Sequence, residues 1–484
     1  MSAREPILVV DVGTSSARAA IVSADGSVDH VRAIPTLPDS PAPGLVEFDA
    51  VALADAALAC ARASLEAGGS VAAVGITTQR ASTIVWDRAT GAPVGPGLGW
   101  QDLRTVGDCL VLQAEGIRLA PNLSATKARH LLDQADPDRT RDLCVGTVET
   151  WMAWRLSDGR LHVTDPTNAA LTGLTDRECR DWDDDLLTAL RIPRAALPAL
   201  VESSGVVGTA SVLPGSPAIA GLVGDQQGSL LGQGCIVPGL AKITFGTGGM
   251  LDTVVGAERP AFHQRGGYGC FPIVAHRVGG RTTWGVEGAM LSAGTNVEWL
   301  RDDLGLVPTS EASHDLAATV TDAGGAWYVP ALLGLGTPRW DYGARGTLLG
   351  VTRGTTAAHV VRAVLEGIAH RGADLVEAAE ADGGQPIATI RVDGGMSANP
   401  TFVQALADAT TRPIEVSPVA EATTLGAAFL AGIAVGTWSS LEEAAGTWSP
   451  ARVVEPAAAT DRDRWRDAVE RASAWIPELS ALDF

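Results

Sequence analysis

The sequence has few of the residues from which metal sites, disulfide scaffolds and membrane spans are built. Its 484 residues include 6 cysteines and 8 histidines. No two cysteines stand in a C-x-x-C arrangement and no histidine cluster accompanies them, so we expect neither a structural zinc site nor a disulfide framework. The uncharged stretch 226–241 is interrupted by glycines and by Pro238, so we expect no membrane-spanning helix.

Basic residues are also scarce, with 36 Lys and Arg against 56 Asp and Glu, which gives a net charge of −20. Such a surface repels nucleic acid and anionic lipid, so we expect no nucleic-acid partner and no membrane partner. No basic and apolar leader precedes the first strand, so we expect no secretory signal and a reducing, cytoplasmic location. The composition, with 46% hydrophobic and 19% charged residues, is globular, and the length predicts two domains.

The first part of the chain predicts a β-meander followed by a helix and a strand. Apolar runs at 7–12, 17–23 and 28–33 are separated by short turns rich in Gly, Ser and Asp, which is typical of antiparallel strands. A helix is expected over 49–67, because Asp49 is a good N-cap and two glycines end the pattern. Residues 71–77 then return as a strand.

The second part of the chain contains a related arrangement. A long apolar helix is expected over 355–380, followed by a strand over 388–392 that ends in Asp393-Gly394-Gly395. Asn399 and Pro400 then begin a helix that runs to about Thr410. Because both parts place an acid and glycines at a strand end, we expect two α/β domains that face one cleft.

The domain border is expected near 256–260, after the Gly-rich segment 242–255. This gives a first domain over 1–256 and a second over 257–484. The tail after Trp438 is expected to be helical, with a loop before the last helix. No short-period repeat is visible, which excludes a solenoid.

Two Gly/Thr-rich turns are candidate phosphate cradles. In Asp11–Arg18, Gly13 allows a tight turn, residues 14–16 offer hydroxyl and N–H groups, and Arg18 adds a positive charge. In Lys242–Gly249, Thr247 occupies a similar place. The alternative for each is an ordinary hairpin turn. Both turns fall in the first predicted domain, whereas the third Gly-rich element, 393–399, falls in the second. This third element is expected either to face a flat ligand such as a purine or to connect a strand and a helix.

Three polar motifs are candidate catalytic and substrate contacts. In Gly224-Asp-Gln-Gln227, Asp225 is placed to accept a proton from a substrate hydroxyl and Gln226 to orient the substrate. Trp100 offers a face for the carbons of a polyol, and Arg80 donates to its oxygens. Considered singly, each motif is also compatible with a surface or packing role.

A dozen motifs stand in one order along most of the chain, from Ile7 to Trp438. They are Asp11–Arg18, Thr77–Arg80, Gly99–Asp102, Ser124–Lys127, Gly146–Trp151, His162–Asn168, Gly224–Gln227, Phe245–Gly248, Gly334–Pro338, Arg345–Gly346, Val392–Gly395 and Thr424–Ala428. With them the sequence resembles the FGGY carbohydrate kinases, and within that family the glycerol kinases. The resemblance implies an α/β fold of two actin-like, ribonuclease-H-like domains with an interdomain cleft. It also implies ATP-dependent phosphorylation of a hydroxyl on a sugar or polyol, with ATP and Mg²⁺ as cofactors.

The resemblance assigns roles to individual residues. The catalytic base is matched by Asp225, and the Mg²⁺ environment by Asp11 and Asp225. The phosphate contacts are matched by Thr14, Ser15, Arg18 and Thr247. The nucleotide side is matched by Gly294, Glu298, Gly395, Met396 and Asn399, although glycerol kinases often have Gln where Glu298 stands. The polyol site is matched by Arg80, Trp100, Asp225 and Gln226.

Three positions of the expected substrate site depart from the glycerol kinase pattern. Ala81 replaces a glutamate that binds glycerol, Asn122 replaces a tyrosine, and Met250 replaces a phenylalanine. We therefore expect the reaction to be kept and the substrate to differ, because glycerol would underfill a site widened at Ala81. The alternative is that other groups or water replace the lost contacts and glycerol is still accepted.

Other functions stay open at this stage. One is a kinase of the same family that acts on a pentulose or a longer polyol. A second is a non-catalytic sugar or nucleotide sensor, against which the presence of Asp11, Asp225 and Thr247 argues. An actin- or chaperone-like ATPase would lack the Asp-Gln-Gln element. The sequence leaves a homo-oligomer open.

Overall fold

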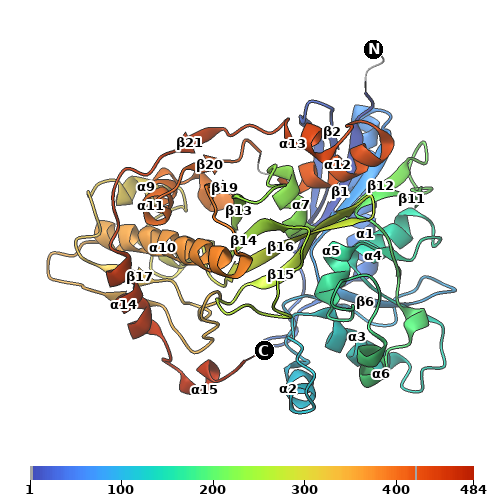
Figure 1. Cartoon of the computed structure of the whole chain (residues 1–484), viewed down its shortest axis with the longest axis horizontal. Coiled ribbons are helices and arrows are strands. Elements are labelled where there is room, and N and C mark those ends of the chain that lie inside the picture. Colours follow the sequence, from blue (N-terminus) through green and yellow to red (C-terminus); the bar gives the residue numbers. More distant parts are fainter. Residues whose placement is uncertain (1–3, 420–421, 484) are drawn as a thin grey trace.

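A computed structural model describes residues 4–419 and 422–483 of the protein. The first of its two large β-sheets comes from the N-terminal half of the chain (Figure 1). Its strands are β1 (Ile7–Val12), β2 (Ser16–Val22), β3 (Val28–Pro35), β5 (Ala73–Thr78), β11 (Ser204–Thr209) and β12 (Ala218–Gly224). They lie side by side in the order β11-β12-β5-β1-β2-β3.

Strand pairing in this sheet confirms the predicted meander. β1, β2 and β3 pair antiparallel, and Asp11 lies opposite Arg18. β5 then pairs parallel with β1, and β12 parallel with β5. All six residues of β1 are buried, as expected for a central strand that is covered on both faces.

The second sheet repeats this pattern. Its strands are β13 (Leu240–Phe245), β14 (Gly249–Gly256), β15 (Phe271–Val278), β16 (Arg281–Met290), β19 (Thr389–Asp393), β20 (Ile414–Val416) and β21 (Arg452–Val454). Their order is β15-β16-β14-β13-β19-β20-β21. β13, β14 and β16 form an antiparallel meander, and β19 and β20 continue it in parallel. The chain is therefore a duplicated α/β structure of the actin-like, ribonuclease-H-like type.

The change of sheet comes earlier than the border expected near 256–260. β13 and β14 pair with each other and belong to the second sheet, so 241–256 does too. The Gly-rich segment that suggested a border is the turn of a hairpin in which Phe245 lies opposite Gly249. The sheets therefore change between Gly232 and Leu240.

Helices cover both faces of the first sheet. On the first sheet, α1 (Ala50–Gly68) and α4 (Val148–Leu156) pack on one face. Asp49 caps α1 as expected, since its side chain accepts from the N–H groups of Val51 and Ala52. α7 (Asp225–Gly232) and α12 (Ala422–Val435) lie at the other face. α12 thus comes from the C-terminal half but packs against the N-terminal sheet (Figure 1).

The second sheet is covered by α10 (Ala357–Gly383) and α11 (Pro400–Thr410), which pack against each other. The N-terminal half also forms a smaller four-stranded sheet. Its strands are β4 (Glu47–Phe48), β6 (Thr83–Asp87), β7 (Gly97–Leu98) and β8 (Leu143–Thr147). Two further strand pairs are β9 (Val163–Thr164) with β10 (Ala199–Leu200) and β17 (Trp327–Val329) with β18 (Thr347–Leu349). The remaining helices are α2 (Val106–Ala114), α3 (Ser124–Ala135), α5 (Pro166–Ala169), η1 (Ala170–Thr172), α6 (Asp184–Leu190), η2 (Arg194–Ala196), α8 (Gly294–Asp302), α9 (Ala312–Ala317), η3 (Gly395–Ala398), α13 (Leu441–Ala445), α14 (Arg462–Ala472) and α15 (Pro477–Ser480).

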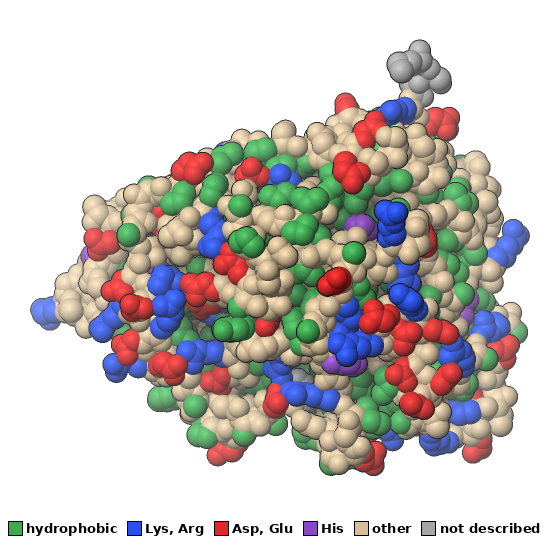
Figure 2. Space-filling model, in the orientation of Figure 1, with side chains coloured by type: hydrophobic (Ala, Val, Ile, Leu, Met, Phe, Trp, Pro, Cys, Tyr) green, Lys and Arg blue, Asp and Glu red, His purple; other side chains and the backbone are tan. Residues whose placement is uncertain are grey.

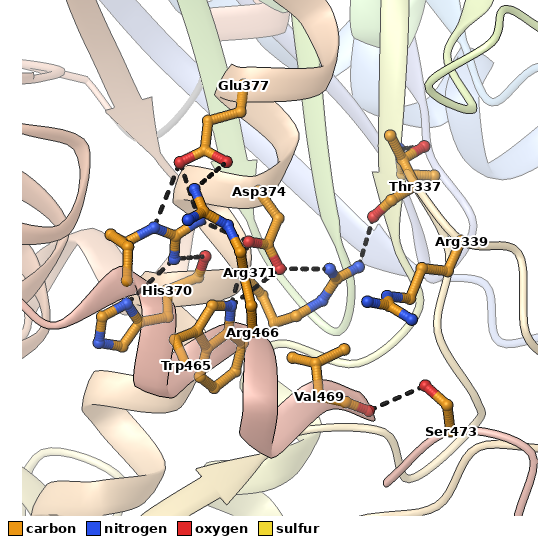
Figure 3. Close-up of polar contacts among 12 residues, drawn as sticks. Thr337, Arg339, His370, Arg371, Asp374, Glu377, Trp465, Arg466, Val469 and Ser473 are labelled. Atoms are coloured by element: carbon orange, nitrogen blue, oxygen red, sulfur yellow. Dashed lines mark hydrogen bonds and ion pairs between the residues drawn. The ribbon is translucent and has the colours of Figure 1, made fainter. Parts of the chain in front are cut away.

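The C-terminal segment is fastened to α10 by a buried polar network (Figure 3). Asp374 on α10 accepts hydrogen bonds from Arg371 at 2.7 Å, from the indole N–H of Trp465 at 3.1 Å and from Arg462. Trp465 also stacks on His370, with ring centroids 5.0 Å apart. The last helices were expected from the sequence, whereas β21 in the same tail was not.

On the face shown in Figure 2, acidic and basic side chains are interspersed, and neither sign of charge forms a continuous patch there. Among the residues that the structure describes, no helix has the length and apolar character needed to span a membrane.

Candidate active site

The two candidate phosphate turns belong to different sheets. In the β1–β2 turn, the Gly13 N–H donates to Ser16 O at 3.0 Å, which leaves residues 14 and 15 at the tip. The Arg18 guanidinium lies beside it, with Nε donating to Ser16 Oγ at 3.1 Å. The β13–β14 turn is closed by Gly246 N–H donating to Gly248 O at 3.0 Å. The expectation that both turns come from the first half is therefore wrong, because the second turn lies between two strands of the second sheet.

The start of α8 packs directly against the β13–β14 turn. The Gly294 N–H donates to Gly246 O at 2.8 Å, and the Thr295 hydroxyl donates to Thr247 O at 3.3 Å. A Cβ atom on Gly294 would lie only 2.6 Å from Gly246 O, so glycine is required there. Glu298 follows one helical turn later on α8 and is exposed. Within the described residues, no hydrogen bond ties its side chain to the turn.

The third Gly-rich element also meets this turn. Gly394 has φ +84°, and a Cβ atom there would lie 2.4 Å from Phe245 O. Gly395 is exposed at the start of η3, whereas Met396 is buried beneath it. Asn399 caps α11 by accepting from Phe402 N–H at 3.1 Å. The elements expected to contact phosphate and adenine are thus adjacent in space.

Asp225 is the first residue of α7 and follows β12 directly. Its side chain is 27% exposed, and its Oδ1 accepts from Gln226 N–H at 2.8 Å and lies 3.4 Å from Arg80 Nε. Burial raises the pKa of Asp225 above its ordinary value, while the positive charge of Arg80 opposes this rise. A partly exposed carboxylate beside a cationic side chain is a suitable acceptor for the proton of a substrate hydroxyl.

Thr167 fixes the backbone that carries Asp225. The Gly224 N–H donates to Thr167 Oγ1 at 2.8 Å, and this hydroxyl donates to Asp165 Oδ1 at 2.8 Å. The Asp165 N–H in turn donates to Glu149 Oε1 at 3.0 Å. Burial, with Asp165 adding to it, raises the pKa of Glu149 well above its ordinary value. The motif His162–Asn168 therefore supports the strand end from which Asp225 projects.

Arg80 is the centre of the expected polyol site. Its guanidinium donates to Gln227 Oε1 at 3.2 Å and forms an ion pair with Glu287 at 2.7 Å. Ala81 follows with φ +60°, in the left-handed region that non-glycine residues rarely adopt, and is buried. Its carbonyl accepts from Ser124 Oγ at 3.1 Å, which joins the start of α3 to this turn.

The other expected substrate residues surround this centre. The Trp100 indole N–H donates to Thr14 Oγ1 at 3.1 Å, so Trp100 reaches the β1–β2 turn. Asn122 is exposed, and its carbonyl accepts from Lys127 Nζ at 2.9 Å. Gln226 and the carbonyl of Met250 are both joined to Lys242 Nζ. For Asn122 and Met250 these contacts involve only the backbone.

Three buried charged residues of the site were not expected from the sequence. Lys242 and Asp252 form an ion pair at 2.6 Å in which neither side chain is exposed, and Glu287 pairs with Arg80. A weak signal existed, because Asp252 and Glu287 are the single acids of their strands and each directly follows an apolar residue. Nothing in that pattern says that the two strands are neighbours.

Two sheets of the actin-like type, a turn from each, and a carboxylate beside an arginine together define a phosphotransferase. Two family models match the chain: the FGGY family of carbohydrate kinases, N-terminal domain, over residues 6–232, and the C-terminal domain of the same family over residues 241–435. The chain belongs to the FGGY family of carbohydrate kinases.

Curated relatives agree with this assignment over nearly the full length. A glycerol kinase from Aromatoleum aromaticum is 44% identical over 495 aligned residues, covering 97% of this chain and 99% of the relative. A glycerol kinase from Trichlorobacter lovleyi is 43% identical with the same coverage. The chain is therefore a kinase that phosphorylates an alcohol group of a sugar or polyol with ATP as the donor.

Solved structures show the same fold. The Plasmodium falciparum glycerol kinase with ADP is similar with a TM-score of 0.89 and 28% identity, covering 97% of this chain and 98% of that chain. A xylulose kinase from Rhodospirillum rubrum has a TM-score of 0.85 at 23% identity, covering 98% and 99% of the two chains.

Proposed function

We propose that the chain transfers the ATP γ-phosphoryl group to a primary hydroxyl of a polyol or ketose longer than glycerol, with Asp225 as the general base. The observation that carries the proposal is the position of Asp225. It begins α7 at the carboxyl end of β12, 3.4 Å from Arg80. Asp225 takes the hydroxyl proton while the incoming oxygen attacks the phosphorus in line with the leaving ADP.

The nucleotide is proposed to bind between the two turns. Thr14, Ser15 and Arg18 on one side and Thr247 on the other would contact its phosphates. Gly294, Glu298, Gly395, Met396 and Asn399 would lie on the adenine side. The proposal is supported by the contact of Gly294 and Gly394 with the β13–β14 turn, which leaves backbone surface without side chains for a ligand.

Asp11 and Asp225, on the two sides of β5, are the residues proposed to hold a Mg²⁺ ion. Asp11 lies opposite Thr77, and Gly224 lies opposite Thr78, so Asp11 and Asp225 flank β5 from the two neighbouring strands. The strands are two spacings apart, about 10 Å. Between them the buried Thr77 hydroxyl has no hydrogen-bond partner in the described part of the chain.

Mg²⁺ commonly uses one or two carboxylates together with water and phosphate oxygens, so two acids are a sufficient protein contribution. Among residues 4–419 and 422–483, no group of three or more His, Cys, Asp or Glu is placed to hold a metal ion. When bound, the ion would neutralise charge on the transferring phosphoryl group.

The substrate proposal depends on Ala81. A glutamate at this position would add a charged acceptor next to Arg80, whereas alanine adds none. A hydrogen bond to a charged group contributes about 1.5–3 kcal/mol. Sites that read hydroxyl groups discriminate strongly when a partner is missing. Glycerol remains the second candidate, because the relatives that are 43–44% identical carry the name glycerol kinase.

A coupled ADP-release assay tests the proposal. We would compare kcat/KM for glycerol, erythritol, the five-carbon alditols, ribulose and xylulose. A longer substrate is expected to be preferred, and Ala81→Glu is expected to move preference toward glycerol. A wide preference for glycerol in the unaltered chain would contradict the substrate proposal, and the lack of ADP release with every compound would contradict the kinase proposal.

We further propose a cytoplasmic location, supported by six free, buried cysteines, which fit a reducing compartment. The oligomeric state is to be measured by light scattering.

A further inference from the structure

Asp252 and Glu287 lie directly opposite each other on the neighbouring antiparallel strands β14 and β16. Both are buried, with 0% and 5% of their surface exposed. Two ionised carboxylates in directly opposite positions repel each other, and burial makes the repulsion larger. Directly opposite positions bring the two carboxyl groups close together, so a single proton between them would relieve the repulsion.

Each acid also faces one buried base. Asp252 pairs with Lys242 at 2.6 Å, and Glu287 pairs with Arg80 at 2.7 Å. The four side chains form a row, Lys242–Asp252–Glu287–Arg80, in which the two acids stand between the two bases. The row runs from β13 across two strands to the turn after β5. This row links the second sheet to the first.

Both ends of this row reach residues proposed to hold the substrate. At one end, Arg80 faces Asp225 at 3.4 Å. At the other, Lys242 Nζ donates to Gln226 Oε1 and, at 3.2 Å, to Thr244 Oγ1. The acid pair therefore fixes two substrate-side groups that approach the site from different directions.

We propose that Asp252 and Glu287 form a carboxyl–carboxylate pair that positions Arg80 and Gln226 for the substrate hydroxyls. Both acids are positioning residues, since neither is open to the site. The inference rests on the proposed function, because it assumes that Arg80 and Gln226 bind the polyol or ketose.

Stability gives no reason for two acids at these places. Replacing buried ion pairs with apolar residues of similar volume is often neutral or stabilising, because each buried charge loses its hydration. The flanking positions of both strands are apolar or small, with Leu251 before Asp252 and Val286 before Glu287. Acids in such surroundings indicate a role in the site.

The charges around the pair agree with one shared proton. The charged and titratable groups that face it are Arg80 from the turn after β5, Lys242 from β13, Asp225 from α7, Asp393 from β19 and Cys270 ahead of β15. Burial raises the pKa of Glu287 to about 7, with Asp252 adding to the rise and Arg80 opposing it. A single proton on the pair lowers its charge from −2 to −1, which leaves less negative charge for Arg80 and Lys242 to balance.

Steady-state kinetics of paired variants test this inference. Glu287→Gln and Asp252→Asn keep the shape and can still form a hydrogen bond between the two side chains, whereas Glu287→Leu and Asp252→Leu cannot. The amide variants are expected to keep KM for the best substrate within about twofold, and the leucine variants to raise it about tenfold or more. KM for ATP is expected to change little in all four.

The control is Glu366→Leu, which breaks an acid–arginine pair with Arg362 on α10, outside the proposed substrate site. It is expected to leave both KM values unchanged. A leucine variant at 287 with an unaltered KM for the substrate would overturn the inference, and so would Glu287→Gln behaving like Glu287→Leu.

An infrared measurement keeps the inference testable if a leucine variant does not fold. The carboxylic-acid carbonyl band at neutral pH is expected to lose intensity in Glu287→Gln relative to the unaltered chain, and an identical spectrum would exclude a shared proton. An unaltered chain that phosphorylates no polyol or ketose would instead contradict the proposed function, so the two failures are distinguishable.

Discussion

The indole N–H of Trp100 donates to the hydroxyl of Thr14 at 3.1 Å. Trp100 is proposed to contact the sugar or polyol, and Thr14 the phosphates of ATP. Gln79 makes a second connection, since its amide donates to Gly13 O at 3.2 Å and its Oε1 accepts from Ser82 Oγ at 2.9 Å. The Ser82 hydroxyl accepts from the backbone N–H of Trp100 at 3.0 Å. The proposed alcohol site and the proposed ATP phosphate site are therefore connected by one closed loop of hydrogen bonds.

This coupling predicts the behaviour of Trp100→Phe. The variant keeps an aromatic face but loses the bond to Thr14, a neutral hydrogen bond that contributes about 0.5–1.5 kcal/mol. KM is expected to rise about three- to tenfold for both ATP and the alcohol substrate. Steady-state kinetics with each substrate varied in turn check this, and Trp475→Phe, at a tryptophan that is 73% exposed, serves as the control. A rise for the alcohol alone would show that the bond to Thr14 does not couple the two ligands.

Asp225→Asn is expected to abolish phosphoryl transfer and to leave ADP binding nearly unchanged. The amide cannot accept the hydroxyl proton, and removal of a general base commonly lowers the rate about a hundredfold or more. Single-turnover assays measure the first effect and calorimetry with ADP the second. An Asn variant with unaltered kcat would rule out Asp225 as the base.

Thr167→Val tests whether the hydrogen bonds of Thr167 to Gly224 and Asp165 hold Asp225 in position. The variant leaves the Gly224 N–H and the Asp165 carboxylate without their shared hydroxyl, which costs about 1–3 kcal/mol for buried groups. We expect a lower unfolding temperature and a kcat reduced about tenfold. Thr167→Ser keeps the hydroxyl and is expected to restore both. If Thr167→Val lowers stability alone, the network does not position Asp225.

Gly294→Ala is expected to disturb the ATP phosphates. Its new methyl group would lie 2.6 Å from Gly246 O and would push the β13–β14 turn away from α8. Displacements of about 1 Å in a site can lower the rate about a hundredfold. We expect kcat/KM for ATP to fall at least tenfold. Gly267→Ala, at a glycine where an added Cβ meets nothing within 4 Å, is the matched control and is expected to be silent.

His370 predicts part of the acid sensitivity of the fold. Burial and the nearby Arg462 lower the pKa of His370 from 6.5 to about 4. Between these values the unfolded chain binds a proton that the folded chain does not, so stability falls as pH decreases from 6.5 to 4. His370→Phe keeps a ring on Trp465 and is expected to show a smaller loss of thermal stability over this range. Melting curves at several pH values check this, with His130→Phe as the control. Equal slopes for all three proteins would exclude a contribution from His370.

Elements with strong local signals could be predicted from the sequence. The β1–β3 meander, α1 with its Asp49 cap, and α11 with its Asn399 cap each depend on residues that are close in the chain. The order of motifs along the chain also predicted the family. Each of these elements or motifs is determined by residues that are close together in the sequence.

Features that depend on distant pairing could not be predicted. The border was expected near 256–260, after the Gly-rich segment 242–255, because the sequence does not show that β13 pairs with β19 and β14 with β16. For the same reason Asp252 and Glu287 could not be placed opposite each other. The three residues of β21 carry too short a pattern to predict a strand. The roles expected for the individual site residues, from Asp225 to Asn122, Met250 and Glu298, all stay predictions.

The polar contacts of the C-terminal segment have a practical consequence for handling the protein. Asp483 forms ion pairs with Arg118, which follows α2 in the N-terminal half, and with Arg265 in the C-terminal half. An affinity tag or fluorescent fusion joined after the last residue would therefore start where the two halves meet. Arg4, by contrast, pairs with Glu443 on α13 at the outer end of the first sheet (Figure 1). For purification, surface immobilisation or labelling, the amino-terminal end is the attachment point that leaves the junction undisturbed.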